Sequence, residues 1–240
     1  MPTIVISGAG SGIGHTFLKF LASDQSNTLH ALDVSFRDKI SDVPAKVHEH
    51  TIDTSSQSSV DGFVKSLDGQ PVDLFIHSAA IRGLVPAITE KEKDPSAAET
   101  MEVMDVDTMM KTLQINTVGS FLLIRALIPN LKAAKQGAKV VIMGSRMGSI
   151  ASNHDGSKYA YRASKAALNA LVKSFSIDVP EISFTIVHPG RVESRMVQTM
   201  REEGAIDAED AIKMMMPMIE GFGKKDTGKF YSREGDEIPW

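Results

Sequence analysis

The sequence predicts an α/β fold, in which helices flank both faces of a doubly wound parallel β-sheet. Short continuous apolar runs recur along the chain, and stretches with helical character separate them. Continuous apolar runs are typical of strands buried on both faces, and strands that alternate with helices form βαβ units. A glycine cluster directly after the first run lies where folds of this class turn from strand into helix.

In the N-terminal half, strands are expected at 3–6, 28–32, 47–52 and 72–76, where the apolar runs lie. The segment between the first and second runs predicts a helix at 12–23, and the segment between the third and fourth runs predicts a helix at 56–68. The longest polar stretch, 89–100, indicates a surface loop or the frayed start of a helix.

In the C-terminal half, apolar runs predict strands at 139–143 and 184–187, and a last strand near 228–231. Helices are expected at 104–134, 157–178 and 193–203. The first of these is expected to break near Asn116. The resulting order of elements predicts a buried parallel sheet.

Composition narrows the class of protein. With 240 residues, 42% of them apolar, the chain can form one sizeable core, so a single domain over 1–240 is expected. The net charge of −4 and the lack of a basic tract argue against partners such as nucleic acid or a membrane surface. The chain has no cysteine, which excludes disulfides, thiol nucleophiles and cysteine-ligated zinc. No apolar run approaches the roughly 18 residues that span a bilayer, and no signal peptide precedes the glycines, so a cytoplasmic protein is expected.

The glycine cluster Ser7–Gly14 predicts a dinucleotide-binding turn. Glycines allow positive φ and let the backbone approach a pyrophosphate, which then lies at the N-terminus of the helix. Gly8, Gly12 and Gly14 have the spacing G-x-x-x-G-x-G, and Ser11 and Ile13 belong to the same turn. A flexible turn without a ligand is the alternative.

Carboxylates at the ends of the next two strands extend the predicted cofactor site. Asp33 closes the second strand, where a carboxylate accepts hydrogen bonds from the ribose hydroxyls of NAD and repels the 2′-phosphate of NADP. Arg37 lies close enough in sequence to pair with that phosphate, so NADP remains an alternative. Asp53 and Thr54 end the third strand and are candidates for adenine contact, or for a plain turn.

A tyrosine and a lysine four positions apart predict an acid–base pair. Tyr161 and Lys165 share one face of the helix expected at 157–178. A phenol ordinarily has a pKa near ~10, and a nearby ammonium, joined by a positively charged nicotinamide, is expected to lower that pKa toward the working range. Ser145, directly after the fifth strand, is expected to hydrogen-bond the substrate oxygen.

Together these motifs resemble the short-chain dehydrogenase/reductase family across essentially the whole chain. The family implies a Rossmann-type fold, a nicotinamide cofactor and a Ser–Tyr–Lys site. Asn116 matches its asparagine, whose backbone holds a water of the proton relay, and Pro189-Gly190 matches the turn beside the nicotinamide. The run from Ala160 to Asn169 and the C-terminal Gly235–Trp240 resemble the C-factor-like branch.

Two departures from the family pattern stand out. The family's Asn-Asn-Ala-Gly after the fourth strand is here His77-Ser78-Ala79-Ala80; Ala79 keeps its place as a cofactor contact, while the histidine needs other partners. The spacing from Ser145 to Tyr161 is longer than usual, so Ser149 is the alternative serine, although Ser145 follows the strand directly.

Some candidates carry no assigned chemistry. His48 and His50 share one face of the third strand, but without a third ligand nearby in sequence no metal site is expected. His188 is expected to pack at the end of its strand. Tyr159 has no lysine four positions on, so it is expected at the rim.

The expected function is NAD(P)-dependent interconversion of a secondary alcohol and a carbonyl compound, with NAD preferred. The alternative is a regulatory or signalling protein that binds the dinucleotide without turnover. A homodimer or homotetramer is expected from the apolar helices 104–134 and 157–178. The methionine-rich segment 195–222 is expected to form an apolar lid over an apolar substrate, or else to dock two helices on the core.

Overall fold

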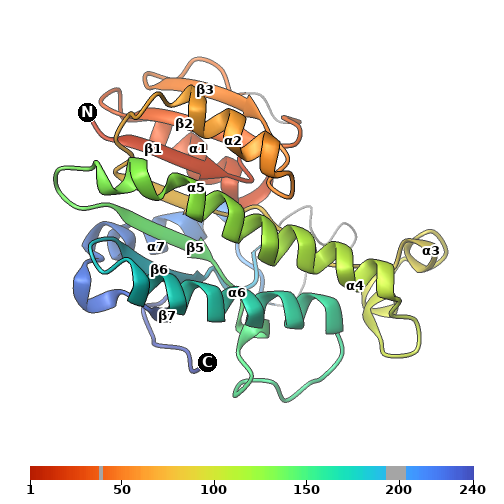
Figure 1. Ribbon diagram of the computed structural model, residues 1–240. Helices are drawn as coiled ribbons and strands as arrows, with labels where there is room; N and C mark the ends of the chain where they lie inside the picture. The colour runs from red at the N-terminus through yellow and green to blue at the C-terminus, as the bar shows by residue number, and fades with distance from the viewer. Residues whose placement is uncertain (38–39, 193–203) are drawn as a thin grey trace.

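The centre of the molecule is one sheet of seven parallel strands. The computed structural model describes residues 1–37, 40–192 and 204–240. The strands lie in the order β3-β2-β1-β4-β5-β6-β7, so the winding reverses between β1 and β4 (Figure 1). Their bounds are β1 Thr3–Ser7, β2 Thr28–Asp33, β3 Lys46–Thr51, β4 Leu74–His77, β5 Lys139–Met143, β6 Ser183–His188 and β7 Lys229–Ser232. This arrangement confirms the doubly wound α/β fold.

Helices cover both faces of the sheet. Helices α1 (Gly12–Ala22) and α7 (Ala208–Gly221) contact each other on one face. Helices α2 (Gln57–Ser66), α5 (Ser120–Lys132) and α6 (Tyr159–Asp178) lie on the other, with α4 (Val106–Leu113) continuing the line of α5 away from the sheet (Figure 1). The short segments are α3 (Pro86–Thr89), η1 (Pro95–Glu99), η2 (Gln114–Gly119), η3 (Arg146–Gly148) and η4 (Lys224–Asp226).

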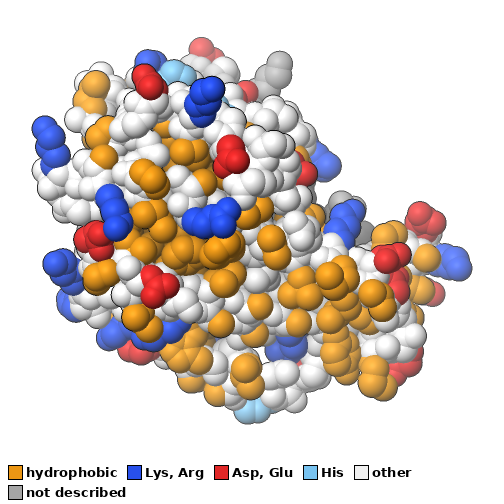
Figure 2. All heavy atoms as spheres, in the orientation of Figure 1, with side chains coloured by type: hydrophobic (Ala, Val, Ile, Leu, Met, Phe, Trp, Pro, Cys, Tyr) orange, Lys and Arg blue, Asp and Glu red, His pale blue; other side chains and the backbone are white. Residues whose placement is uncertain are grey.

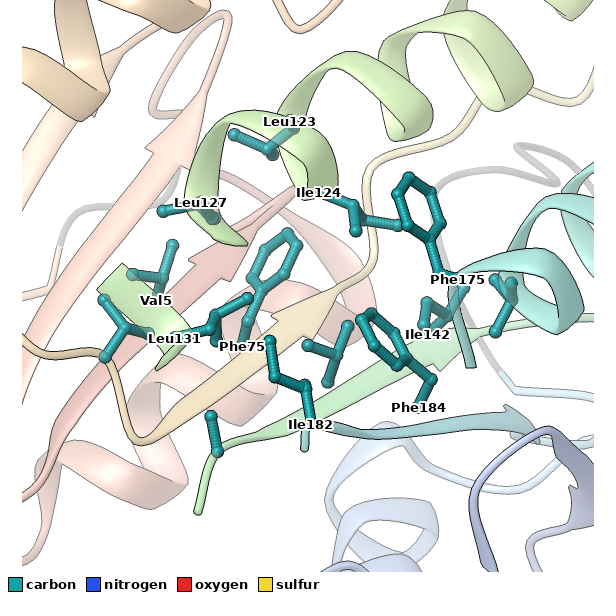
Figure 3. Packing of buried hydrophobic residues seen from close by; sticks show 14 of the residues in the cluster. Val5, Phe75, Leu123, Ile124, Leu127, Leu131, Ile142, Phe175, Ile182 and Phe184 are labelled. Carbon is teal, nitrogen blue, oxygen red and sulfur yellow. The ribbon is translucent and has the colours of Figure 1, made fainter. Parts of the chain in front are cut away.

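Alternating residues of the strands belong to two separate hydrophobic cores, one on each face of the sheet. In β1, Val5 belongs to the core under α2, α5 and α6, whereas Ile4 and Ile6 belong to the core under α1 and α7. Figure 3 shows the first core, where Leu123 and Leu127 of α5 face the apolar side chains of the strands. Successive side chains point to opposite faces of a strand, so a sheet buried on both sides requires the continuous apolar runs seen in the sequence.

The helix predicted at 104–134 does not break near Asn116. It continues as α4, one π-helical stretch (η2) and α5. The Ser120 hydroxyl donates a 2.7 Å hydrogen bond to the Asn116 carbonyl, which stabilises the widened turn. Gly119 packs against Thr54, because a Cβ at position 119 would lie 3.0 Å from Thr54 Oγ1. The sequence prediction of a break was therefore wrong: an extra residue is absorbed within a continuous helix.

The polar stretch 89–100 is more ordered than a surface loop. Its end forms η1, with the Asp94 side chain accepting from the Ser96 N–H at 2.9 Å. Glu99 is buried, and the Val85 N–H donates to the Ala98 carbonyl at 3.0 Å. These contacts tie the stretch to the connection that follows β4.

Helix α7 docks on the core. Met215 and Met216 are buried against α1, whereas Met214 is exposed. Met215 and Met216 therefore dock α7 on the core, which is the alternative to the lid that the sequence left open for this part of the segment. The helix predicted at 193–203, and residues 195–203 of the predicted lid, lie outside the described residues, so the lid over 195–222 stays a prediction.

One helical stretch, Val106–Lys132, is long and apolar enough to cross a membrane by length and composition alone, judged over the described residues. Core helices of globular proteins pass the same test, and Ile124 and Leu131 of this stretch are buried in the core beside the sheet. Figure 2 shows that further apolar side chains of this side of the molecule remain at the surface, over the region of α4, α5 and α6.

Candidate active site

A large cavity opens at the carboxyl ends of the strands. Its volume is about 1460 Å³, and its walls come from the loops after β1, β2, β4, β5 and β6 and from the start of α6. Ligands bind at this edge of doubly wound sheets, beside the point where the strand order reverses. The structure brings these predicted residues together around it: Gly8, Ser11, Gly12, Ile13, Asp33, Asp53, Thr54, Ala79, Ser145, Tyr161, Lys165, Pro189 and Gly190.

The glycine turn has the backbone that a cofactor loop requires. Gly8 and Gly12 adopt positive φ, at 71° and 58°. A Cβ on Gly8 would lie 2.7 Å from the Ala79 backbone nitrogen, so only glycine lets these two loops approach. Gly14 is not among the lining residues; a Cβ there would collide with the Gly8 carbonyl oxygen. Its contribution is close packing of helix on strand rather than ligand contact.

The carboxylate of Asp33 is held in place at the edge of the cavity. It accepts hydrogen bonds from the Gly10 N–H at 2.9 Å and from the Ser35 N–H at 3.2 Å. Arg37 lines the same part of the cavity and is exposed. The carboxylate of Asp53 accepts from the Ser55 N–H and hydroxyl, as in a plain turn, although Asp53 also lines the cavity.

The histidine that replaces the first family asparagine connects two elements. His77 Nδ1 lies 2.7 Å from Ser7 Oγ, and its Nε2 lies 2.6 Å from Ser120 Oγ. Because the Ser120 hydroxyl donates to the Asn116 carbonyl, it must accept from His77 Nε2–H, and Nδ1 in turn accepts from the Ser7 hydroxyl. Burial lowers the pKa of His77 to about 3, which keeps this tautomer neutral.

Asn116 is buried beside the site and is absent from the lining residues. Its side-chain amide donates to the Ile81 carbonyl at 2.8 Å and to Ser164 Oγ at 3.0 Å, and its oxygen accepts from the Ile81 N–H at 2.8 Å. The side chain therefore fixes the loop after β4 against α6, and its carbonyl is the end of the His77–Ser120 chain of hydrogen bonds.

Tyr161, Ser145 and Lys165 meet at the centre of the cavity wall. Ser145 and Tyr161 both line this wall, where the Ser145 side chain favours the ionised phenol and so lowers the pKa of Tyr161, and Lys165 Nζ lies 5.7 Å from the centroid of the tyrosine ring. The Lys165 ammonium donates to the Met143 carbonyl at 3.0 Å. The spacing of four residues on α6 thus places both side chains on one face, as predicted.

The surroundings of the Tyr161 phenol shift its pKa upward. Burial of the phenol raises its pKa to about 12, and the Ser145 side chain opposes this rise. Burial also lowers the pKa of Lys165 to about 8. Lys165 is not among the groups that lower the Tyr161 pKa here, because its ammonium is bonded to the Met143 carbonyl and desolvation of the phenol dominates. The lowering expected from the ammonium together with a positively charged nicotinamide stays a prediction.

The structure distinguishes the two candidate serines. Ser145 lines the cavity, whereas Ser149 is buried outside the lining and bonds to Ser152 Oγ at 3.0 Å. Gly148, between them, packs on the backbone of Lys165, since a Cβ there would lie 2.8 Å from its carbonyl carbon. The longer spacing is thereby accommodated without moving Ser145.

The turn after β6 completes the wall. Gly190 has φ 77°, and Arg233 Nη1 donates to the Pro189 carbonyl at 3.2 Å. His188 also lines the cavity, and burial lowers its pKa to about 4. Its Nδ1 is buried without a hydrogen-bond partner among the described residues. His188 thus packs at the end of its strand, as expected, and also lines the cavity.

A third histidine joins the predicted pair on β3. His30 of β2 lies beside His48 in register, and its Nδ1 is 3.0 Å from His50 Nε2. The rings stack, with interplanar angles of 14° and 23° to His30, so the nitrogens do not converge on one point. Over residues 1–37, 40–192 and 204–240, no group of three ligand side chains is arranged to hold a metal ion.

Sequence reasoning missed Arg82, a residue of the cavity wall, and its buried partner Glu99. They form a bidentate ion pair, with Nε–Oε2 and Nη2–Oε1 distances of 2.9 and 2.8 Å, and Arg82 lines the cavity. The only signal was an acidic residue next to apolar Ala97-Ala98 in a polar stretch, which does not reveal a partner 17 positions away.

Comparison with known proteins agrees with this geometry. A family described as "short chain dehydrogenase" matches residues 2–205. The chain is 36% identical to C-signal of Myxococcus xanthus over 71% of this chain and 93% of that protein. It is 27% identical to 1-hydroxy-2-glutathionyl-2-methyl-3-butene dehydrogenase of a Rhodococcus strain, over the whole of both chains. Among solved structures, the carbonyl reductase Sniffer of D. melanogaster aligns over all of both chains, with a TM-score of 0.81 and 26% identity.

Each of these findings points the same way as the parallel sheet, the glycine turn and the Ser–Tyr–Lys cluster. The matched region runs from before β1 to beyond β6 and so includes each of the predicted site residues. The chain belongs to the short-chain dehydrogenase/reductase family.

Proposed function

We propose that the protein is an NAD(P)-dependent oxidoreductase that interconverts a secondary alcohol and a carbonyl compound. The observation that carries the proposal is the meeting of Ser145, Tyr161 and Lys165 in the same cavity as the Gly8 turn and Asp33. A group that can move a proton thus shares one space with a loop suited to a dinucleotide.

The residues present fit a nicotinamide cofactor. The Gly8 and Ala79 loops approach so closely that a Cβ on Gly8 would lie 2.7 Å from the Ala79 nitrogen, so the turn offers backbone surface for a pyrophosphate. Asp33, held by two backbone N–H groups, offers its carboxylate to ribose hydroxyls. NAD is therefore the proposed cofactor, with NADP as the alternative because Arg37 lines the same region.

The chemistry divides between the cofactor and the side chains. When bound, the nicotinamide supplies or accepts the hydride. The Tyr161 hydroxyl gives a proton to the substrate oxygen, or takes one from it, and the Ser145 hydroxyl orients that oxygen. The Lys165 ammonium, 3.0 Å from the Met143 carbonyl, would hold the nicotinamide ribose. The Asn116 side chain, which lies outside the lining, would support the site by fixing the loop after β4 against α6.

The proposed substrate is largely apolar. Apolar side chains of the cavity lining include Leu84 and Val85 from the loop after β4, and Met147 and Val192, although charged side chains such as Arg82 and Arg146 belong to the same lining. A wall of this kind favours apolar groups around the reacting carbon. Assay of a panel of ketones and aldehydes that differ in apolar bulk would test this; a preference for sugars or phosphate esters would contradict it.

A second candidate function is regulation or signalling without turnover. The similarity to C-signal and the replacement of the Asn-Asn-Ala-Gly motif by His77–Ala80 favour it. Titration with NADH and NADPH by fluorescence, followed by the carbonyl panel, separates the two. The oxidoreductase proposal expects binding and turnover, whereas binding with no turnover on any carbonyl would support the second function.

A further inference from the structure

A buried ion pair lies behind the proposed active site. Arg82 and Glu99 are joined by two hydrogen bonds of 2.9 and 2.8 Å, and their side chains are only 10% and 1% exposed. Bidentate pairs of this kind are geometrically rigid, and removal of one partner leaves an uncompensated buried charge. The pair joins the loop after β4 to η1.

The same residues support the start of α6. The Glu99 carbonyl accepts from the Lys158 N–H at 2.9 Å and from the Ser157 hydroxyl at 3.1 Å, directly before α6 begins at Tyr159. On the other side, a Cβ on Gly83 would lie 3.0 Å from Ala160 Cβ, so the backbone next to Arg82 abuts the first turn of the helix. Tyr161 belongs to that turn.

Four groups determine the electrostatic surroundings of the Tyr161 phenol. Ser145 acts on it from the loop after β5, and Lys165 lies along the same helix. From the loop after β4 and from η1, the Arg82 guanidinium lowers the pKa of Tyr161 and the Glu99 carboxylate raises it. The two charges of the pair therefore act on the phenol with opposite sign.

We propose that the Arg82–Glu99 ion pair is a positioning element for Tyr161, which fixes the first turn of α6 and places a balanced pair of charges beside the phenol. This role rests on the proposed function of Tyr161 as the proton donor. With the pair intact, the wall that carries Arg82 and the helix that carries Tyr161 keep one geometry, and the two charges act on the phenol in opposite directions.

The test reads the phenol directly. The chain has three tyrosines, so ¹³C labelling at the tyrosine ring carbon that bears oxygen gives three resonances, and Tyr161→Phe assigns the one of interest. At a fixed alkaline pH, Glu99→Gln should raise the ratio of phenolate to phenol at Tyr161 by about tenfold, and Arg82→Gln should lower it by a similar factor. The signals of Tyr159 and Tyr231 should not move.

Controls separate this role from mere stability. Glu181→Gln breaks an exposed ion pair with Lys132, 2.6 Å long, and should leave Tyr161 unchanged. If Arg82→Gln fails to fold, the double variant Arg82→Gln/Glu99→Gln replaces it, and its Tyr161 signal should show less phenolate than that of Glu99→Gln. A Tyr161 signal that shifts in the same direction in both single variants, or in neither, would overturn the proposal.

The turnover assay tests the proposed function separately from the role of the ion pair. If the wild-type protein turned over no alcohol or carbonyl compound, the oxidoreductase proposal would fall, yet the NMR comparison would still show whether the pair governs the phenol. If turnover is found, the pH profile of kcat should shift in the same directions as the NMR signal. A purely structural pair would change the melting temperature and leave the profile in place.

Discussion

Tyr161 is the residue on which the proposed chemistry depends. Tyr161→Phe removes the hydroxyl while keeping the ring in its half-buried position, so turnover should fall by about 10²–10⁴-fold and cofactor binding should persist. Steady-state kinetics and a fluorescence titration measure the two quantities. Tyr159→Phe is the matched control, since Tyr159 is exposed on the same turn and should keep wild-type rates. A Tyr161→Phe enzyme with more than about a tenth of the wild-type rate would contradict acid–base catalysis by this group.

Asp33 determines the second prediction, a preference for NAD over NADP. Its carboxylate is fixed by the Gly10 and Ser35 N–H groups and would repel a 2′-phosphate. We expect kcat/KM to be higher for NAD, and Asp33→Asn to reduce the difference. Arg37→Ala tests the opposing group: if the wild type used NADP as well as or better than NAD, this variant should lose that ability.

His77 makes stability depend on pH. Its pKa is about 3 when buried and near 6.5 in the unfolded chain, so the unfolded state binds a proton first as the pH falls. The stabilisation is complete above pH ~6.5 and is lost on acidification toward the folded pKa, by up to about 1.4 kcal/mol per pH unit. Urea unfolding at several pH values measures the slope. His77→Gln should flatten it, whereas His154→Gln, on the surface, should not.

Secondary-structure elements were predictable where the signal is local. Apolar runs placed the interior strands, because a strand buried on both faces must be largely apolar, as the 139–143 run of β5 shows. The edge strands β3 and β7 were also predicted near their positions, although their signal is weaker because they are only partly buried. The Ser7–Gly14 turn and the spacing of Tyr161 and Lys165 are equally local. The arrangement of η1 was not predictable, because it depends on Glu99 meeting Arg82 across the fold. The π-helical turn likewise depends on contacts of Asn116 with Ile81 and Ser164.

The docking of α7 yields a stability prediction for this element. Met215 is fully buried between α7 and the core, so Met215→Ala should lower the free energy of unfolding by about 2–5 kcal/mol. Met214, one residue earlier, is 45% exposed, and Met214→Ala should change it by less than about 0.5 kcal/mol. Chemical denaturation measures the free energy of unfolding of both variants. Equal losses in the two variants would show that the buried Met215 side chain does not anchor α7 to the core.

At the scale of the whole molecule, apolar side chains are exposed along α5 and α6. We propose that this surface is the contact between the copies of a homo-oligomer. Val118, in η2 just before α5, and Ile177 of α6 are exposed, and Phe121 of α5 stacks on Phe175 of α6 with ring centroids 5.7 Å apart. Figure 2 shows apolar side chains at the surface on this side of the molecule. Isologous contacts between such faces are common in symmetric dimers. Sedimentation should give a mass at least twice 26.0 kDa.

Charge placed on that surface tests which face is used. Val118→Glu should shift the sedimenting species toward 26.0 kDa, because a carboxylate would be buried in the contact. Ile150→Glu alters an equally apolar and more exposed side chain on a loop outside these helices and should leave the assembly intact. A wild-type protein that sediments as a monomer at micromolar concentration would refute the oligomer.

The π-helical turn at 114–119 also determines how α4 and α5 are oriented about their shared axis. Each residue of an α-helix advances the azimuth by about 100°, so the extra residue in this turn rotates everything after it relative to a regular helix. Loss of one residue here would preserve helicity yet swing Leu123 and Leu127 away from the sheet by about that angle. The widened turn thus sets the rotation of α5 relative to α4. It lets one continuous helix place Asn116 beside the active site and place Leu123 and Leu127 in the core.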